Sequence, residues 1–230
     1  MRILAIETVE TTGSVALLDD DVLVAERQLD AKVRSAQSLA PGIADLLKEF
    51  HLRPTDVELV AVASGPGSFT GLRIGVTTAK VFAYATGGQV IGVGTMIAIA
   101  SRVPADVPRF SVVLDAGRGE LFVADFSRQE GGTLLGNQTT RLVGAERWID
   151  ELPPGTIVTG PGLVRWAQRI EPPATLIDRT LWAPTASAVG RVGWRNFADG
   201  GRTAVLELVP RYFRRTAAEE QWDRQSKDVG

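Results

Sequence analysis

The chain has 230 residues, a formal net charge of −2 and no cysteine. The lack of cysteine excludes disulfides, thiolate nucleophiles and zinc–thiolate centres, and the near-neutral balance gives no electrostatic basis for tight stand-alone binding to nucleic acid. The start of the chain shows no secretory leader, and its longest apolar stretch, residues 90–100, falls short of the roughly 20 residues that span a bilayer. We therefore expect a cytoplasmic protein that makes no membrane contact.

The first part of the chain predicts a small α/β unit. Apolar runs bounded by turn residues predict strands at residues 3–7, 14–18, 22–29, 59–63 and 90–93. Apolar side chains at helical spacing predict helices at residues 35–50 and 76–86.

The second part repeats this order of elements. Strands are expected at residues 110–114, 121–126, 133–142, 156–159 and 176–177, and helices at residues 144–151, 163–170 and 185–198. Pro104 and Pro108 mark a linker between the halves. The predicted architecture is therefore α/β, with two similar lobes over residues 1–105 and 106–230, each a mixed sheet with flanking helices.

A glycine-rich loop at residues 64–75, with the sequence SGPGSFTGLRIG, stands between a predicted strand and a predicted helix. Free backbone N–H groups at a helix start suit an anion or a close-packed neighbour. Two interpretations stay open. The glycines either supply permissive torsions for a strand–helix turn, or small residues spaced three or four apart let a partner helix approach. Arg73 opposes the helix dipole, which indicates an external carboxylate or phosphate.

Four passages make the chain similar to the bacterial TsaB (YeaZ) family, in the glycoprotease-like (peptidase M22-like) branch of the actin-like ATPase superfamily. They are residues 1–8 with 14–17, residues 65–75, residues 115–122 and residues 210–214. The resemblance covers nearly the whole chain and implies two actin-like (ribonuclease H-like) lobes.

The same resemblance implies a function. It describes a non-catalytic scaffold or activator subunit needed to make N6-threonylcarbamoyladenosine in tRNA. Such a subunit pairs with a metal-holding TsaD-type transferase, is joined by a TsaE-type ATPase, forms a homodimer alone, and meets tRNA indirectly.

The resemblance also places the pairing surface on the helices that follow the first hairpin and the glycine loop. The residues expected to face a partner are Leu39, Ile43, Leu46, Thr70, Leu72, Arg73, Gly75, Val76, Ala79, Phe82 and Ala83. On this interpretation, Gly75→Trp or Ala79→Trp abolishes pairing and leaves the fold intact.

A metal centre is not expected, because the chain has one histidine, His51, at the end of a predicted helix where a positive charge favours the dipole. A metalloprotease is set aside for the same reason.

Degraded versions of the actin-like nucleotide loops occur at Glu7, Thr8, Asp115, Gly117 and Gly160. We favour tight turns kept by the fold over a working nucleotide site. No cofactor is therefore expected, with ATP or ADP only at a subunit boundary. The alternative function is an ATP-binding actin-like ATPase or small-molecule kinase.

Overall fold

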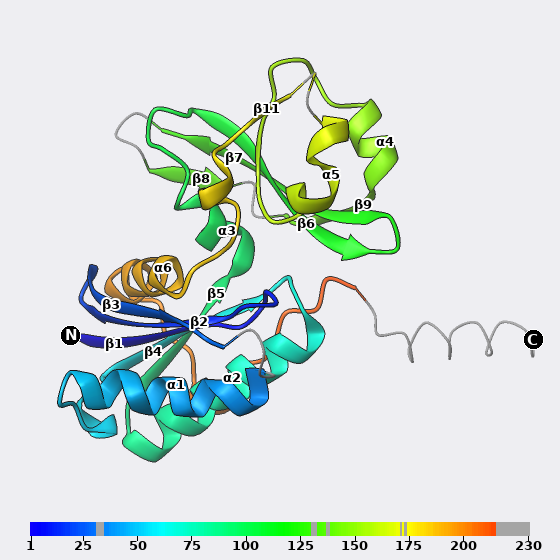
Figure 1. Ribbon diagram of the computed structural model, residues 1–230. Helices are drawn as coiled ribbons and strands as arrows, with labels where there is room; N and C mark the ends of the chain where they lie inside the picture. The colour runs from blue at the N-terminus through cyan, green and yellow to red at the C-terminus, as the bar shows by residue number, and fades with distance from the viewer. Residues whose placement is uncertain (31–34, 130–132, 137–138, 171, 173, 215–230) are drawn as a thin grey trace, which may run out of the picture.

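The computed structural model describes residues 1–30, 35–129, 133–136, 139–170, 172 and 174–214, which form two α/β lobes (Figure 1). The first lobe contains a five-stranded sheet in the order β3-β2-β1-β4-β5, and the second contains a six-stranded sheet built around β6 and β7. Both sheets mix parallel and antiparallel pairs. The predicted α/β class with two sheet-based lobes is confirmed.

The first lobe is built from elements that the apolar runs predicted well. Its strands are β1 (Arg2–Glu7), β2 (Ser14–Asp19), β3 (Val22–Gln28), β4 (Leu59–Gly65) and β5 (Gln89–Gly94). Its first two helices are α1 (Ser35–Glu49) and α2 (Phe69–Thr86), with a 3₁₀ turn at Pro54–Asp56. Strands β1, β2 and β4 are buried over nearly their whole length, as expected for a sheet covered on both faces.

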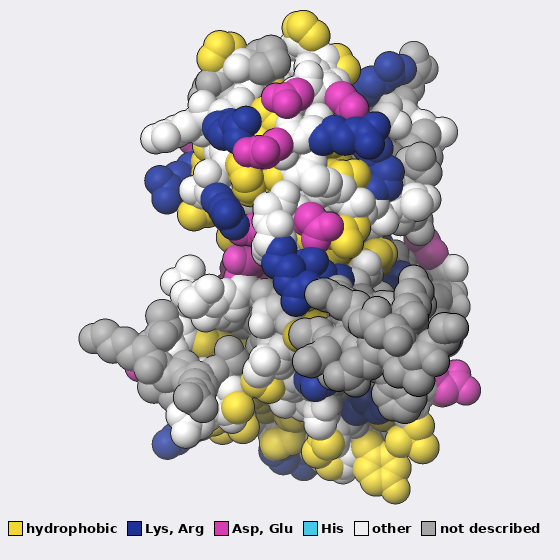
Figure 2. Space-filling model, turned by 90° about the vertical axis from the view of Figure 1, so that its right-hand side faces the viewer, with side chains coloured by type: hydrophobic (Ala, Val, Ile, Leu, Met, Phe, Trp, Pro, Cys, Tyr) yellow, Lys and Arg dark blue, Asp and Glu magenta, His cyan; other side chains and the backbone are white. Residues whose placement is uncertain are grey.

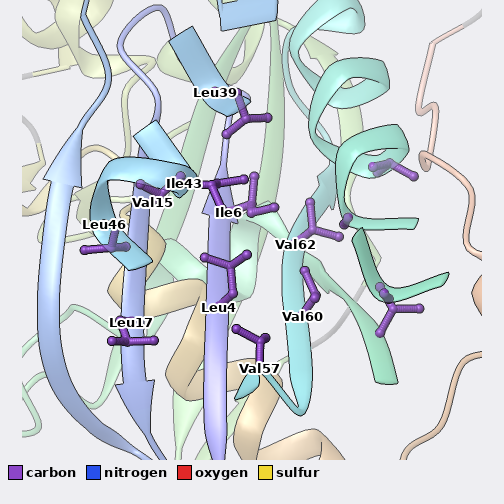
Figure 3. Close-up of a cluster of buried hydrophobic side chains, with 14 of the residues drawn as sticks. Leu4, Ile6, Val15, Leu17, Leu39, Ile43, Leu46, Val57, Val60 and Val62 are labelled. Atoms are coloured by element: carbon purple, nitrogen blue, oxygen red, sulfur yellow. The ribbon is translucent and has the colours of Figure 1, made fainter. Parts of the chain in front are cut away.

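Helices α1 and α2 cover one face of the first sheet. In Figure 3 the α1 side chains Leu39, Ile43 and Leu46 turn toward β1 and β2, which carry Ile6 and Leu17. All five side chains are buried, so the apolar stripe of α1 is used within the lobe.

Helix α2 begins about two turns before the predicted residue 76. Ser68 is its N-cap, because the Ser68 Oγ accepts the N–H of Gly71 at 3.2 Å. Gly87 ends the helix with a left-handed φ of 74°. Gly71 and Gly75 therefore lie inside the helix, although their types had suggested a longer loop.

The second lobe contains shorter elements than the first. Its strands are β6 (Arg109–Gly117), β7 (Glu120–Arg128), β8 (Leu134–Gly136), β9 (Arg141–Gly144), β10 (Ile157–Thr159) and β11 (Thr175–Leu176). Its helical elements are α4 (Ala145–Asp150), α5 (Leu163–Ile170) and a 3₁₀ turn at Arg179–Leu181. The single strand predicted over residues 133–142 is wrong, because β8 and β9 pair separately with β7, and residues 137–138 lie outside the described part.

Helix α6 (Ala186–Ala198) covers the other face of the first sheet, opposite α1 and α2 (Figure 1). The helix lies very close to the sheet. A Cβ atom on Gly190 would lie 2.4 Å from Leu18 Cδ1, and one on Gly193 would lie 2.7 Å from Ala61 Cβ. The glycines of α6 therefore let the helix settle directly on the strands.

The predicted division into residues 1–105 and 106–230 is therefore wrong at its carboxyl end. After α6, Thr203 bridges to Val90 of β5, and the Lys80 Nζ of α2 donates to the carbonyl of Leu206 at 2.9 Å. The last 3₁₀ turn, Val205–Glu207, thus packs on α2, and residues 186–209 complete the first lobe.

A short helix, α3 (Thr95–Ala100), was not predicted and lies between the lobes. Its Ala98 packs in a cluster of the first lobe, whereas Met96 and Ile99 pack with Phe110 and Phe122 of the second. Because α3 is buried on both sides, it lacks the one-sided apolar pattern that reveals surface helices.

Candidate functional site

A groove of about 510 Å³ runs between α1 and α2 on the outside of the first lobe. None of the described residues that line it is charged: Ala40, Ile43, Ala44, Leu47, Pro54, Thr77, Thr78, Val81, Phe82, Ala85 and Thr86. Figure 2 shows hydrophobic side chains gathered along the lower edge of the molecule, where α1 and α2 lie in Figure 1. On α2, Val81 is 62% exposed and Tyr84 is 75% exposed. Large exposed apolar patches of this kind mark interaction surfaces.

Only four of the eleven residues predicted to face a partner line the groove or are exposed. Ile43 and Phe82 line the groove, and Thr70 and Arg73 are exposed at the start of α2. The other seven predicted residues are buried inside the first lobe: Leu39, Leu46, Leu72, Gly75, Val76, Ala79 and Ala83. The prediction therefore selected the inward face of each helix.

The small residues of α2 are explained by the end of β1. Thr8 Oγ1 donates to the carbonyl of Gly71 at 2.8 Å, and a Cβ atom on Gly75 would lie 2.3 Å from the same Thr8 oxygen. The glycines thus admit β1, and nothing about their spacing requires a partner. Gly75→Trp would break this packing, and Ala79→Trp would overfill a fully buried position. Both variants should therefore disturb the fold, contrary to the expectation from the sequence.

The lining residues that the prediction missed are Ala40, Ala44, Leu47, Pro54, Thr77, Thr78, Val81, Ala85 and Thr86. On α2, residues 77, 81 and 85 are exposed, whereas residues 72, 76, 79 and 83 are buried. The helical phase of the buried apolar positions was the signal that could have identified this outer face.

Arg73 is held by its own chain at the start of α2. Its guanidinium carbon lies 5.0 Å from the centre of the Phe69 ring and 5.8 Å from that of Tyr212, and its Nε donates to the Tyr212 hydroxyl at 3.0 Å. The two rings stack at 4.1 Å. These internal contacts account for a cation that opposes the helix dipole, without an external anion.

A second pocket, of about 430 Å³, lies between the lobes. Its walls come from the glycine loop, from the β6–β7 hairpin that carries Asp115 and Gly117, and from residues 211–214. Asp115 Oδ1 accepts the N–H of Gly117 at 2.8 Å, and Asp115 Oδ2 lies 3.6 Å from Arg165 Nη1. Two of the five predicted nucleotide residues therefore face an interlobe space.

The other three predicted nucleotide residues are used in packing. Glu7, which is 1% exposed, accepts the N–H of Val9 at 2.6 Å, and burial raises the pKa of its carboxyl to about 8. Burial also raises the pKa of nearby Glu10, to about 7. Thr8 is bound to α2, and a Cβ atom on Gly160 would lie 2.2 Å from the carbonyl oxygen of Val113.

His51 follows α1 in a left-handed conformation, with φ at 53°, and its N–H donates to the carbonyl of Lys48 at 3.1 Å. In the ranges that the structure describes, no three His, Cys, Asp or Glu side chains come together as metal ligands. The helices of those ranges also lack the combination of length and apolar character that crossing a bilayer requires.

Comparisons with known proteins match nearly the whole chain. The family described as "TsaD: tRNA N6-adenosine threonylcarbamoyltransferase" matches residues 29–156. The tRNA threonylcarbamoyladenosine biosynthesis protein TsaB of Escherichia coli (strain K12) is 30% identical over 224 residues, which is 95% of this chain and 96% of that protein. TsaB of Bacillus subtilis (strain 168) is 28% identical over 99% of this chain and 100% of its own length.

Among solved structures, YeaZ from Pseudomonas aeruginosa is similar with a TM-score of 0.78 at 24% identity, over 92% of this chain and 99% of that one. Likeness at this identity bears on the fold, and it agrees with two lobes built on mixed sheets. The molecule is thus a two-lobed, actin-like α/β protein, as the sequence predicted.

The full-length match to the Escherichia coli protein then narrows the class. The chain belongs to the TsaB family. The resemblance read from four passages of sequence is confirmed.

Proposed function

We propose that this chain is a non-catalytic scaffold subunit in the synthesis of N6-threonylcarbamoyladenosine in tRNA, and that it pairs with a TsaD-type transferase through the α1–α2 groove. The TsaB relatives are named for this biosynthesis. The observation that supports this pairing surface is the uncharged groove, which is lined by the exposed side chain of Val81. A partner helix with an apolar face fits between two such helices.

The contacts of Glu7 and Thr8 support a non-catalytic role, in which the chain binds no nucleotide between its own lobes. A carboxyl that burial keeps largely protonated near pH 7, and a hydroxyl already bonded to Gly71, are not free to meet a nucleotide and its metal ion. Any ATP or ADP would then bind at the boundary with the partner.

The same groove would serve the homodimer, so the homodimer and the heterodimer would exclude each other. On this proposal a TsaE-type ATPase joins the heterodimer, tRNA is contacted through the transferase, and the complex works in the cytoplasm. The scaffold would act by favouring one conformation of the transferase, because a partner shifts an equilibrium only through its preference for one state.

The pairing surface is tested with two matched substitutions. Val81→Asp places a charge at the groove, and Val164→Asp places the same charge on α5 of the second lobe, where Val164 is 70% exposed. Titration calorimetry with the TsaD-type transferase should show affinity lowered on the order of a hundredfold by the first variant and unchanged by the second. Equal affinities for both variants and the wild type would exclude the groove.

The functional role is tested by nucleoside mass spectrometry of tRNA from a reconstituted reaction. Modified adenosine should be lost when only this chain is omitted, and Val81→Asp should reproduce the loss. Product made at the full rate without the chain would contradict the scaffold role.

The second candidate function is an ATP-binding ATPase or small-molecule kinase, because Asp115 and Gly117 line the interlobe pocket. ATP with magnesium raises the melting temperature of a protein whose folded form binds it. We expect no such shift for this chain alone, and a shift that saturates with ATP would favour the second candidate.

A further inference from the structure

Residues 210–214, which we call the C-terminal strap, run from the first lobe to the second. At the first lobe, the N–H of Arg211 donates to the carbonyl of Ser64, at the end of β4, at 2.7 Å. Tyr212 then stacks on Phe69 and accepts the hydrogen bond from Arg73. The strap is thus fixed to both β4 and the start of α2.

The other end of the strap is fixed to the second lobe. The Phe213 ring meets Phe122 of β7 edge-on, with centroids 6.2 Å apart. Arg214 Nη1 donates to the carbonyl of Ala116 at 2.8 Å, and Arg214 Nη2 lies 2.6 Å from Glu120 Oε2. The side chains of this ion pair are 21% and 33% exposed, so water screens the pair less than it screens a fully exposed one.

The covalent connections between the lobes lie elsewhere. The chain crosses once after α3 and again before α6, and Arg102 joins the two crossings, because its guanidinium donates to the carbonyls of Ala183 and Thr180. In Figure 1 these crossings lie near α3, whereas the strap, in orange, lies apart from them near the start of α2. These crossings therefore connect the lobes on one side, and the strap links them through side-chain and backbone contacts on another.

We propose that the C-terminal strap holds the two lobes closed. The strap forms one wall of the 430 Å³ interlobe pocket, whose other walls are the glycine loop and the β6–β7 hairpin. Two lobes that meet at a hinge move freely unless something spans the opposite side. Here the chain itself provides the span.

This arrangement links the lobes to the partner groove. Tyr212 and Arg73 connect the strap to α2, and α2 carries the exposed side of the groove. The proposal does not depend on which partner binds there, so it stands or fails separately from the proposed function.

The test measures the distance between the lobes. Since the chain has no cysteine, Thr55→Cys in the first lobe and Gln168→Cys in the second, both at exposed positions, accept spin labels uniquely. Double electron–electron resonance should give one narrow distribution of distances between the two labels for the full chain. Arg214→Ala and the isosteric Glu120→Gln should each raise the population at longer distance about tenfold. Arg147→Ala, which removes a strap-independent arginine ion pair, should leave the distribution unchanged.

Exchanging the two charged residues of the ion pair tests whether the strap joins the lobes or stabilises only one of them. The double variant Arg214→Glu with Glu120→Arg should recover the narrow distribution, because the ion pair is restored in reverse. Two results would overturn the proposal. One is a distribution unchanged by either single variant. The other is a lowered melting temperature with no population at longer distance, which would show that the strap stabilises only the lobe it touches.

Discussion

Replacing Glu7 by glutamine should make the protein more stable at neutral and alkaline pH. Glu7 sits at the end of β1, almost wholly buried, where its side chain accepts N–H groups from Val9 and Glu10. A glutamine Oε1 can keep both hydrogen bonds. The substitution removes only the charge that the carboxyl would carry at high pH.

The expected size follows from the pKa values. Burial raises the pKa of Glu7 from 4.5 in the unfolded chain to about 8 in the folded protein. Between these values the folded protein holds a proton that the unfolded chain has released, so the stability from this group is present in full below pH 4.5 and is lost as pH rises through about 8. At roughly 1.4 kcal/mol per pKa unit, the loss is about 3 kcal/mol at pH 7 and somewhat more at pH 8.

Urea unfolding of the wild type and Glu7→Gln, from pH 5 to pH 9, measures this loss directly. The two proteins should be within about 1 kcal/mol at pH 5, and the variant should be the more stable by about 3 kcal/mol at pH 7 and about 4 kcal/mol at pH 8. A smaller pH dependence should remain in the variant, because the pKa of Glu10 is also raised, to about 7. Glu207→Gln, at an exposed carboxyl, serves as the control. A variant that is less stable than the wild type at pH 8, or equally pH-dependent, would refute the reasoning.

Two further predictions concern packing. Gly75→Ala should lower the free energy of unfolding by about 3 kcal/mol, because its methyl group would overlap Thr8 Oγ1. Gly144→Ala, whose methyl group would meet no atom within 4 Å, should lower it by under about 1 kcal/mol. Similar losses for the two variants in urea unfolding would contradict this account. Glu26→Ala should lower the melting temperature by about 3–6 °C, because both carboxylate oxygens of Glu26 accept hydrogen bonds from Ser187 at the start of α6, and an unchanged value in calorimetry would show that this cap contributes nothing.

The sequence predicted those elements that carry their own signal. Strands β1 and β2 are apolar runs bounded by turn residues, and α1 has a clean apolar stripe, so their limits fall within two residues of the predicted ones. Helix α3 has no such signal, because its residues are buried between two lobes. The start of α2 was missed because Gly71 and Gly75 resemble loop residues, and only the approach of Thr8 explains them inside a helix.

The site was predicted at the level of elements and less well at the level of residues. The similarity to TsaB selected α1 and α2, which do flank an uncharged groove, but it could not give the rotation of each helix. The fate of the carboxyl end was also out of reach, since α6 returns to the first lobe through contacts such as Ala186 N–H to Ser14 Oγ, far apart in sequence. Contacts of that range leave no local pattern.

The return of α6 has a consequence for how the chain is made. Until residues 186–198 have left the ribosome, one face of the first sheet has no cover, and its buried residues Ile3, Ala5, Leu18 and Ala61 stay open to water. The second lobe, whose strands and helices all lie between residues 109 and 181, has its full set of elements earlier. The lobe that is synthesised first is therefore the one that finishes folding last.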